Sequence, residues 1–404
     1  MKIAHFPGDF LPIIGGAQIA VHNIAKYQRL KGHEVKVIVK NQKALDVKRR
    51  YLSDFPYEIL PLKNKSFGVI SLGEKMGFDL KFYLLNQLKK LQRKNKFDLW
   101  HFNLATEQAI YTIPLLKKMG VPSVVTCRGC DIQKMASVGY GLRLNPEFEE
   151  KFLKTIPTAN FFTAISNSVA EEYRELGISE QQIAVIPNGL EVDRIRDVPV
   201  DKAEFRKKVG WPIDKKIIIT IGRNHPKKGY ILIPDIIKII KDFRKDFLWV
   251  IIGKNCEAVY EKAVELKVES HLLIMDELGI EHSNSTSLSL PTDDIIMAYK
   301  ASDLFAFPTL IETFGNVQIE AMAAGIPVIT TDAPGARDLV FHKENGLVSK
   351  VGDIKGMADN ILELFQDKEM YNTLVYKGLQ YVEGFYWKDV ADKYLRVYEN
   401  IIKL

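Results

Sequence analysis

The sequence predicts an α/β protein made of two doubly wound, parallel-sheet (Rossmann-like) domains. The chain has 404 residues, a length that suits two domains of ordinary size. Short apolar runs alternate with amphipathic helical segments from the first residue, as in β-α-β units. The turn signal Pro187-Asn188-Gly189 separates two such series. We therefore expect two parallel sheets in tandem.

The first series predicts an N-terminal domain over residues 1–190. Its strands are expected at residues 2–6, 34–40, 97–102, 121–126, 161–166 and 183–186. Helices are expected at residues 17–31 and 106–118, and after residue 166 up to residue 175. The stretch 191–212 is polar and has no long apolar run, so it is predicted to be the linker.

The second series predicts a C-terminal domain over residues 191–386. Its strands are expected at residues 216–221, 248–252, 272–275 and 303–307, with another starting at 328. Helices are expected at residues 230–241, 357–366, 369–382 and 390–404. Two doubly wound domains in tandem are expected to face each other across a cleft at the carboxyl ends of their strands, where open sheets bind ligands.

Positive charge is concentrated near the N-terminus. The formal net charge is +6, but residues 1–100 alone hold 19 Lys and Arg against 8 Asp and Glu. Residues 74–96 show apolar side chains at helical spacing and end in a cluster of lysines and an arginine, a pattern that suits an anionic membrane surface. The alternative is an apolar stripe that faces the core, with solvated lysines. No basic-aromatic module accompanies the charge, so a nucleic-acid partner is not expected.

The predicted location is cytoplasmic. No window approaches the ~20 consecutive apolar residues that a membrane-spanning helix requires. The chain begins with a predicted strand instead of a signal-like segment, and its three cysteines fit a reducing compartment.

The stretch from Glu312 to Gly325 carries the strongest functional signal. Glu312 and Glu320 stand eight positions apart, and a helix is expected to begin near Asn316 between them. The N–H groups of Phe314, Gly315 and Asn316 would then point out of a helix start, where anions bind. Carboxylates repel phosphate, so the glutamates are expected to hold uncharged hydroxyls. The segment therefore predicts a pocket for a phosphate-linked polyol, the alternative being a loop with two solvated glutamates.

A second site is predicted where the first strand of the C-terminal domain ends. Gly222 and Arg223 follow that strand, and Lys228-Gly229 precede the next helix. Two cations at a sheet's carboxyl edge suit a diphosphate, because Arg binds it bidentately and Lys acts as a point charge. The alternative is a basic surface loop. The Walker loop is absent from this context.

Candidate residues also follow strands of the N-terminal domain. Gly16 lies between the first strand and its helix, where a glycine lets backbone approach a ligand closely. Arg128 and Asp131 follow the strand at 121–126 and are candidates for contact with a transferred group. His101 ends the neighbouring strand and could reach acceptor or sugar, or could equally be a satisfied structural histidine.

Taken together, these motifs resemble the retaining, nucleotide-sugar-dependent glycosyltransferases of family 4, which have the GT-B fold. The resemblance extends over essentially the whole chain. It rests on motifs in a fixed order: G-G-A-Q from Gly15, G-H-E-V from Gly32, I-P-N-G from Ile186, Gly222-Arg223 with Lys228-Gly229, and Pro308 with the Glu312/Glu320 pair and A-G-I-P-V from Ala324.

The resemblance implies a role for each matching position. Arg223 and Lys228 would hold the donor diphosphate and stabilise the departing nucleotide. Glu312 would contact the donor sugar, assisted by backbone at residues 314–316, and Glu320 would bind the ribose. Gly16 would let the first domain approach the phosphates and the acceptor. The last helix, about residues 387–404, would pack back on the N-terminal domain.

One position departs from the family pattern. Many relatives have histidine where this chain has Arg128, within T-x-H-G-x-D. Arginine stays protonated and cannot act as a base at neutral pH. We expect Arg128 to bind an anionic sugar or acceptor group, with catalysis resting on charge stabilisation by Arg223 and Lys228.

The sequence thus predicts a retaining hexosyltransferase that moves a sugar from a nucleotide diphosphate, with UDP favoured, to a hydroxyl acceptor. The acceptor is expected to be a glycan or a lipid-linked intermediate in cell-surface polysaccharide or glycoconjugate synthesis. No metal or other cofactor is expected, because Arg and Lys can replace a divalent ion. Two alternatives remain: a catalytically silent nucleotide-sugar-binding relative that acts as a sensor or partner subunit, and a nicotinamide-dependent oxidoreductase.

Overall fold

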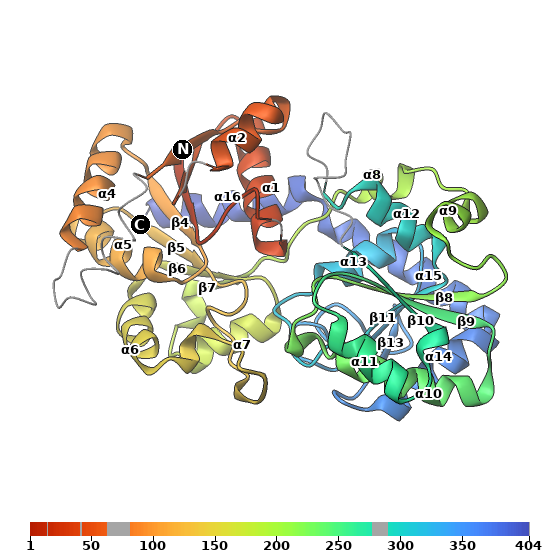
Figure 1. Ribbon diagram of the computed structural model, residues 1–404. Coiled ribbons are helices and arrows are strands. Elements are labelled where there is room, and N and C mark those ends of the chain that lie inside the picture. Colours follow the sequence, from red (N-terminus) through yellow and green to blue (C-terminus); the bar gives the residue numbers. More distant parts are fainter. Residues whose placement is uncertain (14, 41–42, 63–80, 277–289, 404) are drawn as a thin grey trace. The chain divides into compact units, whose positions relative to one another are not determined.

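The computed structural model describes residues 1–13, 15–40, 43–62, 81–276 and 290–403 (Figure 1). These residues form two compact units. One comprises Met1–Gly189 and the helix that starts at Trp387, and the other comprises the described residues of Leu190–Tyr386. The sequence placed these boundaries after residues 190 and 386.

The first unit has a seven-stranded parallel sheet in the order β3-β2-β1-β4-β5-β6-β7. Its strands are β1 (Lys2–Pro7), β2 (Glu34–Val39), β3 (Glu58–Pro61), β4 (Leu99–Asn103), β5 (Ser123–Thr126), β6 (Phe161–Ala164) and β7 (Ile183–Val185). Its helices are α1 (Gly16–Leu30), α2 (Lys43–Arg50), α4 (Lys81–Asn95), α5 (Glu107–Lys118), α6 (Pro146–Thr155), α7 (Asn167–Glu175) and α16 (Trp387–Lys403). Helix α16 packs against α1, where Lys31 pairs with Asp392 at 2.8 Å.

The second unit has a six-stranded parallel sheet in the order β10-β9-β8-β11-β12-β13. Its strands are β8 (Lys216–Ile221), β9 (Phe247–Ile252), β10 (Leu272–Met275), β11 (Leu304–Phe307), β12 (Val328–Thr331) and β13 (Leu347–Ser349). Its helices are α8 (Val192–Asp197), α9 (Lys202–Val209), α10 (Ile233–Phe243), α11 (Glu257–Glu265), α12 (Asp293–Ala301), α13 (Asn316–Ala323), α14 (Ile354–Gln366) and α15 (Lys368–Tyr381).

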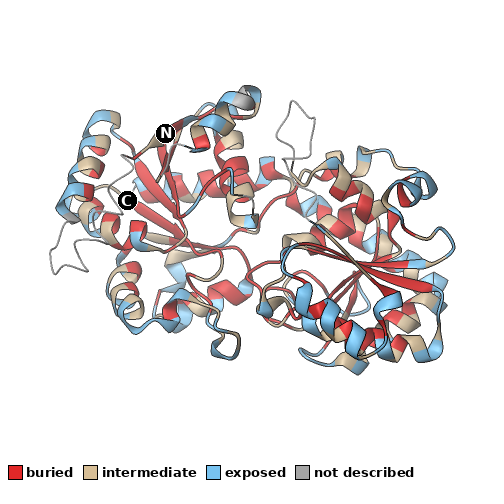
Figure 2. Cartoon of the chain, viewed as in Figure 1, coloured by how far each residue is buried: buried red, intermediate tan, exposed pale blue. Residues whose placement is uncertain are grey.

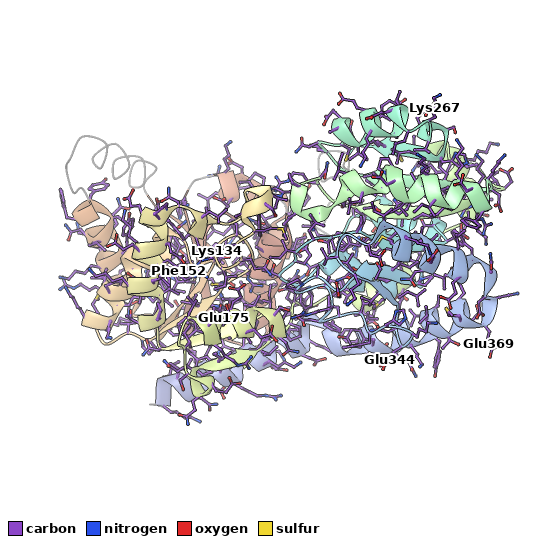
Figure 3. The ribbon with its side chains drawn as sticks, turned by 90° about the horizontal axis from the view of Figure 1, so that it is seen from below. Lys134, Phe152, Glu175, Lys267, Glu344 and Glu369 are labelled. Atoms are coloured by element: carbon purple, nitrogen blue, oxygen red, sulfur yellow. The ribbon has the colours of Figure 1, made fainter. Side chains whose placement is uncertain are left out.

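Each sheet is buried on both faces by its helices (Figure 2). Strand β9 is buried along its whole length, and β8 is buried except at Lys216. Such strands read as continuous apolar runs in the sequence, which is why they were predicted. Charged side chains such as Lys267 and Glu369 lie on the outer surface of the second unit (Figure 3).

The predicted linker at residues 191–212 is wrong in part, because it contains two short helices of the second unit, α8 and α9. Asp201 caps α9 by accepting from two backbone N–H groups, and Gly210 ends it at φ 76°. Val192 and Ile195 of α8 are buried. The apolar content of each helix is too small to stand out as a periodic run.

The predicted amphipathic stretch 74–96 is described from Lys81 onward, and residues 74–80 lie outside the described part of the chain. Leu84 and Leu88 of α4 are buried, so this part of the apolar stripe faces the interior of the unit. Phe82 and Tyr83 at the start of the helix are 60% and 38% exposed.

Candidate functional site

The second unit brings the predicted donor residues together where its strand order reverses. After β10 the chain returns to the middle of the sheet, so β8 and β11 are neighbours although they are distant in sequence. The loops that leave their carboxyl ends diverge at this switch point, which is where open α/β sheets bind ligands. The loop after β8 carries Arg223 and Lys228, and the loop after β11 carries Glu312.

The two lysines of the β8 loop are held by a short 3₁₀ turn, Pro226–Lys228. The carbonyl of Lys227 accepts from the N–H of Leu310 at 2.8 Å and from the hydroxyl of Thr309 at 3.2 Å. Gly229 ends the turn at φ 66°, and a Cβ at this position would lie 2.0 Å from the carbonyl oxygen of Pro308. Glycine is therefore required here for both conformation and close approach, and the β8 and β11 loops pack as one structure.

Glu312 lies between the two lysines. Its Oε1 pairs with Nζ of Lys228, and its Oε2 lies 3.5 Å from Nζ of Lys227. Burial alone would raise the pKa of Glu312, but the charges of Lys228 and Lys227 lower it to about 2. Lys228 also lies 4.8 Å from the ring centre of Phe307. The carboxylate is thus ionised at neutral pH. The backbone N–H of Glu312 donates to the carbonyl oxygen of Pro334 at 2.9 Å.

Arg223 and Gly222 begin the same loop. Arg223 is exposed and forms no ion pair with any residue that the structure describes. Gly222 has φ 129°, a conformation that disfavours other residues. Burial, followed by the charges of Lys227, Arg223 and Lys228, lowers the pKa of His225, so this histidine adds no charge at neutral pH. The loop therefore carries three cations, of which Lys227 and Lys228 pair with Glu312.

Glu320 lies one turn inside α13, as predicted, and is partly buried. Burial raises its pKa to about 7, against the opposing effects of Tyr299 and Lys228. The fully buried Tyr299 of α12 donates to Oε2 of Glu320 at 3.2 Å. One glutamate of the pair is thus firmly ionised and the other is close to half-protonated at neutral pH.

The start of α13 is where the sequence placed it, at Asn316. Gly315 precedes it at φ 87°, and a Cβ there would lie 2.6 Å from the side-chain nitrogen of Gln318. Phe314 is 2% exposed, and its ring centre lies 6.2 Å from that of Phe385. The backbone of this segment is therefore held firmly at the helix N-terminus, a position that favours anions.

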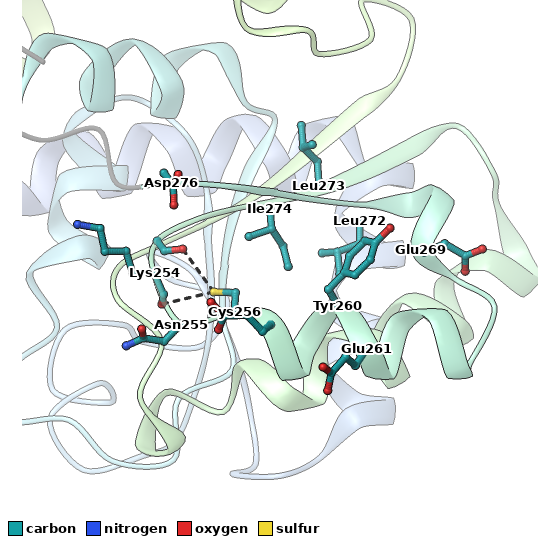
Figure 4. Close-up of a pocket in the computed structure, with 12 residues that line it drawn as sticks. Lys254, Asn255, Cys256, Tyr260, Glu261, Glu269, Leu272, Leu273, Ile274 and Asp276 are labelled. Carbon is teal, nitrogen blue, oxygen red and sulfur yellow. Dashed lines mark hydrogen bonds between the residues drawn. The ribbon is translucent and has the colours of Figure 1, made fainter.

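A pocket of about 760 Å³ lies beside these loops in the second unit (Figure 4). One end is lined by residues 253–256 after β9 and by Asp276 after β10. The remainder is lined by α11 and β10, including Tyr260 and Glu261. A Cβ at Gly253 would lie 2.1 Å from the carbonyl oxygen of Gly222, so the β9 loop touches the β8 loop.

The candidates of the first unit have a different character. Arg128 is 7% exposed, and its guanidinium donates to three neutral side chains. Nε and Nη2 contact Oδ1 of Asn103 at 3.3 and 2.9 Å, and Nη1 contacts Oδ1 of Asn188 at 2.7 Å. Nη2 also lies 3.4 Å from the hydroxyl of Tyr394 in α16. Arg128 thus joins β4, the segment after β7 and the last helix.

Asp131 and His101, which the sequence offers as candidates for substrate contact, are fully buried. The carboxylate of Asp131 accepts from the N–H groups of Ala105, Arg128 and Gly129 at 2.8, 3.1 and 2.8 Å. Burial raises the pKa of Asp131 despite these bonds. Asp131 therefore organises two loops, and its side chain has no surface left for a ligand.

His101 bonds to Thr126 through Nε2 and to the hydroxyl of Tyr398 through Nδ1, both at 2.6 Å. Burial, with smaller contributions from His5 and Arg128, holds its pKa well below the usual range. His101 is therefore neutral and bonded through both ring nitrogens, and its contact with acceptor or sugar stays a prediction. Gly16 is exposed at the first position of α1.

Two residues of the second unit were not singled out by the sequence. The doubled lysine before Gly229 was the signal that could have found Lys227. Tyr299 stands 21 positions before Glu320 and no local pattern links the two, because their contact depends on the packing of α12 on α13.

Comparison with known proteins agrees with this architecture. The model for glycosyl transferases group 1 matches residues 201–381, and the model for Glycosyltransferase Family 4 matches residues 14–194. The solved structure of HepE from Anabaena in complex with UDP superposes with a TM-score of 0.77 at 19% identity, covering 99% of this chain and 100% of that one. The fold is therefore the GT-B fold of glycosyltransferases.

Two curated relatives extend the comparison. N-acetyl-alpha-D-glucosaminyl L-malate synthase of Bacillus anthracis is 22% identical over 400 residues, which cover 97% of this chain and 96% of the relative. The capsular polysaccharide biosynthesis glycosyltransferase CapM of Staphylococcus aureus is 27% identical over 242 residues, 57% of this chain and 60% of CapM. With both family models matched in order, the chain belongs to the family 4 glycosyltransferases.

No helix among the described residues has both the length and the apolar character needed to cross a membrane.

Proposed function

We propose that this glycosyltransferase is a retaining enzyme that takes a hexosyl group from a nucleotide diphosphate sugar, preferably a UDP-sugar. The observation that carries the proposal is the set of Arg223, Lys227 and Lys228 around the buried, ionised Glu312 at the switch point of the second sheet. Arg223 and Lys228 suit a diphosphate, and the carboxylate suits the hydroxyls of the donor sugar.

The ribose, the phosphates and the nucleobase of the donor are proposed to bind along the same carboxyl edge of the second sheet. Glu320 is the group for the ribose hydroxyls, and the N-terminus of α13 favours the phosphates through its N–H groups. The pocket end lined by residues 253–255 and Asp276 suits the nucleobase, since its loop touches Gly222. Support for uracil comes from the fold relative HepE, whose structure contains UDP.

In the proposed reaction the bond between the anomeric carbon and the phosphate oxygen breaks while the acceptor oxygen bonds to that carbon on the same face. The acceptor proton passes to the departing phosphate oxygen, so the products are the glycoside and UDP. The protein's part is to stabilise the negative charge that grows on the diphosphate, through Arg223 and Lys228. These cations supply the role of a divalent ion, so chelators are expected to leave activity unchanged.

The proposed acceptor is a hydroxyl of a glycan or a lipid-linked intermediate in cell-surface polysaccharide or glycoconjugate synthesis. CapM, a relative named for capsular polysaccharide biosynthesis, supports this class. The proposed location is the cytoplasm, at the inner face of the plasma membrane. Helix α4 supports it, because Lys90, Arg93 and Lys94 are exposed on the same helix as Phe82 and Tyr83.

A nucleotide screen tests the donor. UDP, GDP and ADP are compared by thermal shift and calorimetry, and a ligand at about 100 times its dissociation constant adds roughly 2.7 kcal/mol of stability. Turnover of UDP-sugars is then measured for Lys228→Ala. Unchanged turnover in this variant would contradict the proposal, whereas binding without turnover in the wild type would indicate a catalytically silent relative.

Sedimentation with lipid vesicles tests the membrane surface. Wild-type protein is expected to sediment with vesicles containing phosphatidylglycerol and not with pure phosphatidylcholine. Exchanging Lys90, Arg93 and Lys94 for glutamate should abolish sedimentation, because the attraction to anionic lipid is electrostatic. Equal sedimentation of this variant would exclude α4 as the contact.

A further inference from the structure

Glu312 has a lysine on each of its two oxygens. Lys228 pairs with Oε1, and Lys227 lies 3.5 Å from Oε2. The side chains of Lys227 and Lys228 are 12% and 19% exposed, and that of Glu312 is 6% exposed. Both ion pairs are therefore largely withdrawn from water, where a carboxylate that lost both lysines would be strongly disfavoured.

The backbone of each partner is fixed before any ligand binds. The carbonyl of Lys227 is held by Leu310 and Thr309, and the N–H of Glu312 is held by Pro334. A Cβ at Gly335 would lie 2.3 Å from the carbonyl oxygen of Glu312, so the β12 loop also presses on this segment. The contact between Lys227 and Glu312 is thus a consequence of how three loops pack.

The charges of this cluster match those of a donor. Arg223, Lys227 and Lys228 together with Glu312 leave two positive charges, and the diphosphate of a nucleotide sugar carries two negative charges. When Lys228 turns toward a phosphate, it gives up Oε1 of Glu312. A buried carboxylate without a cation is strongly disfavoured, so Glu312 needs a second partner at that moment.

On the basis of the donor site proposed above, we infer that Lys227 is a positioning residue for Glu312. It stays on Oε2 while Lys228 engages the diphosphate, and so keeps the carboxylate ionised and oriented toward the donor sugar. Lys228 binds the nucleotide, whereas Lys227 acts through Glu312. The two adjacent lysines therefore have separable effects.

Calorimetry with UDP separates the effects of the two lysines, because UDP contains the diphosphate and lacks the transferred sugar. Lys228→Met is expected to weaken UDP binding about 10- to 100-fold, as for a lost hydrogen bond between charged groups. Lys227→Met should change UDP affinity by less than about threefold. The matched control is Lys216→Met, which removes a lysine paired with Asp303 at 3.7 Å at the opposite end of β8. This control should leave UDP affinity unchanged.

Release of UDP from UDP-glucose, UDP-galactose and UDP-N-acetylglucosamine supplies the second measurement. For the sugar that the wild type turns over, Lys227→Met should lower kcat about 10-fold or more with KM nearly unchanged, and Lys227→Arg should restore most of it. In a Glu312→Gln background, Lys227→Met should have almost no further effect on kcat.

The inference would be overturned by a loss of UDP affinity in Lys227→Met equal to that in Lys228→Met, or by an equal loss of kcat with and without Glu312. An unchanged kcat in Lys227→Met would overturn it as well. A wild-type protein that binds no UDP would instead overturn the proposed donor, so the two failures are distinguishable.

Discussion

The carboxyl edges of the two sheets carry polar clusters of opposite kinds. In the second unit, the Arg223 side chain is exposed and the charges of the lysines exceed that of Glu312. In the first unit, Arg128 and Asp131 are buried, and their side chains bond to other segments of the same unit, such as Asn188 for Arg128 and Ala105 for Asp131. Both clusters follow strands at the carboxyl edge of a sheet. The difference shows that a residue's position at the carboxyl edge makes it a candidate for ligand binding. Its hydrogen-bond and ion-pair partners within the fold then decide whether its side chain can contact a ligand.

The largest effect should come from the second unit's cluster. Lys228→Met is expected to lower kcat/KM about 100- to 1,000-fold, the range for removing one preorganised charge-stabilising group. Unfolding by urea should show little change, because Lys227 still neutralises Glu312. Steady-state UDP release and urea titration measure the two quantities. A large loss of stability with normal kcat/KM would reverse the contrast between the units.

Substitutions in the cluster of the first unit should mainly lower the free energy of unfolding. Asp131→Ala leaves the N–H groups of Ala105, Arg128 and Gly129 buried without an acceptor, and should reduce the free energy of unfolding by about 3 kcal/mol. Asp131→Asn keeps one acceptor oxygen and should lose less. Urea titration measures both variants. A fully stable but inactive Asp131→Ala would return this carboxylate to the list of substrate contacts.

Variants of Arg128 test whether one residue can both stabilise the first unit and contact a substrate. Arg128→Met removes donors from Asn103, Asn188 and Tyr394, and should reduce the free energy of unfolding by about 2 kcal/mol. Arg128→Lys cannot reproduce the forked contacts and should recover less than half of that loss. If the variants are stable but inactive on one nucleotide sugar, Arg128 recognises that substrate. Unchanged activity of Arg128→Lys on every nucleotide sugar would argue against a bidentate contact.

Much of the fold could be predicted because buried parallel strands are continuous apolar runs. The strand at 216–221 matches β8, and the helix start at Asn316 matches α13. Short helices such as α8 and α9 were missed because they bury few apolar side chains. Strand β3 was also missed, although Ile59 is buried within it.

The sequence could predict which residues of the candidate site lie close together where they follow adjacent strands. It was less informative where contacts between side chains distant in sequence decide whether a residue is buried. Glu312 and Lys228 meet because β8 and β11 are neighbours. The burial of His101 depends on Tyr398, which stands 297 positions away in α16, and no local pattern reports such a contact. Lys227 was overlooked for the same reason, since its role depends on which oxygen of Glu312 it reaches.

The smallest expected effect concerns the two glutamates within the second unit's own cluster. Glu320 has a pKa of about 7 in the folded protein, above the ordinary glutamate value of 4.5, because burial favours the neutral form. The folded state therefore binds the proton more tightly than the unfolded state, and stability should fall as pH rises from about 4.5 through about 7. Since Glu320 is partly exposed, the loss should amount to about 1–2 kcal/mol.

Glu320→Gln should remove that fall, which is measured as the difference between variant and wild type in urea titrations at pH 5 and pH 7.5. Tyr299 and Lys228, the groups that act on Glu320, remain unchanged in this comparison. Glu312→Gln should behave in the opposite sense. The pKa of Glu312 is lowered to about 2, so its contribution is present above the ordinary value and disappears only as pH falls toward 2. If both variants shift the same pH range, burial and not the lysines sets the ionisation of Glu312, and the distinction between the two glutamates is lost.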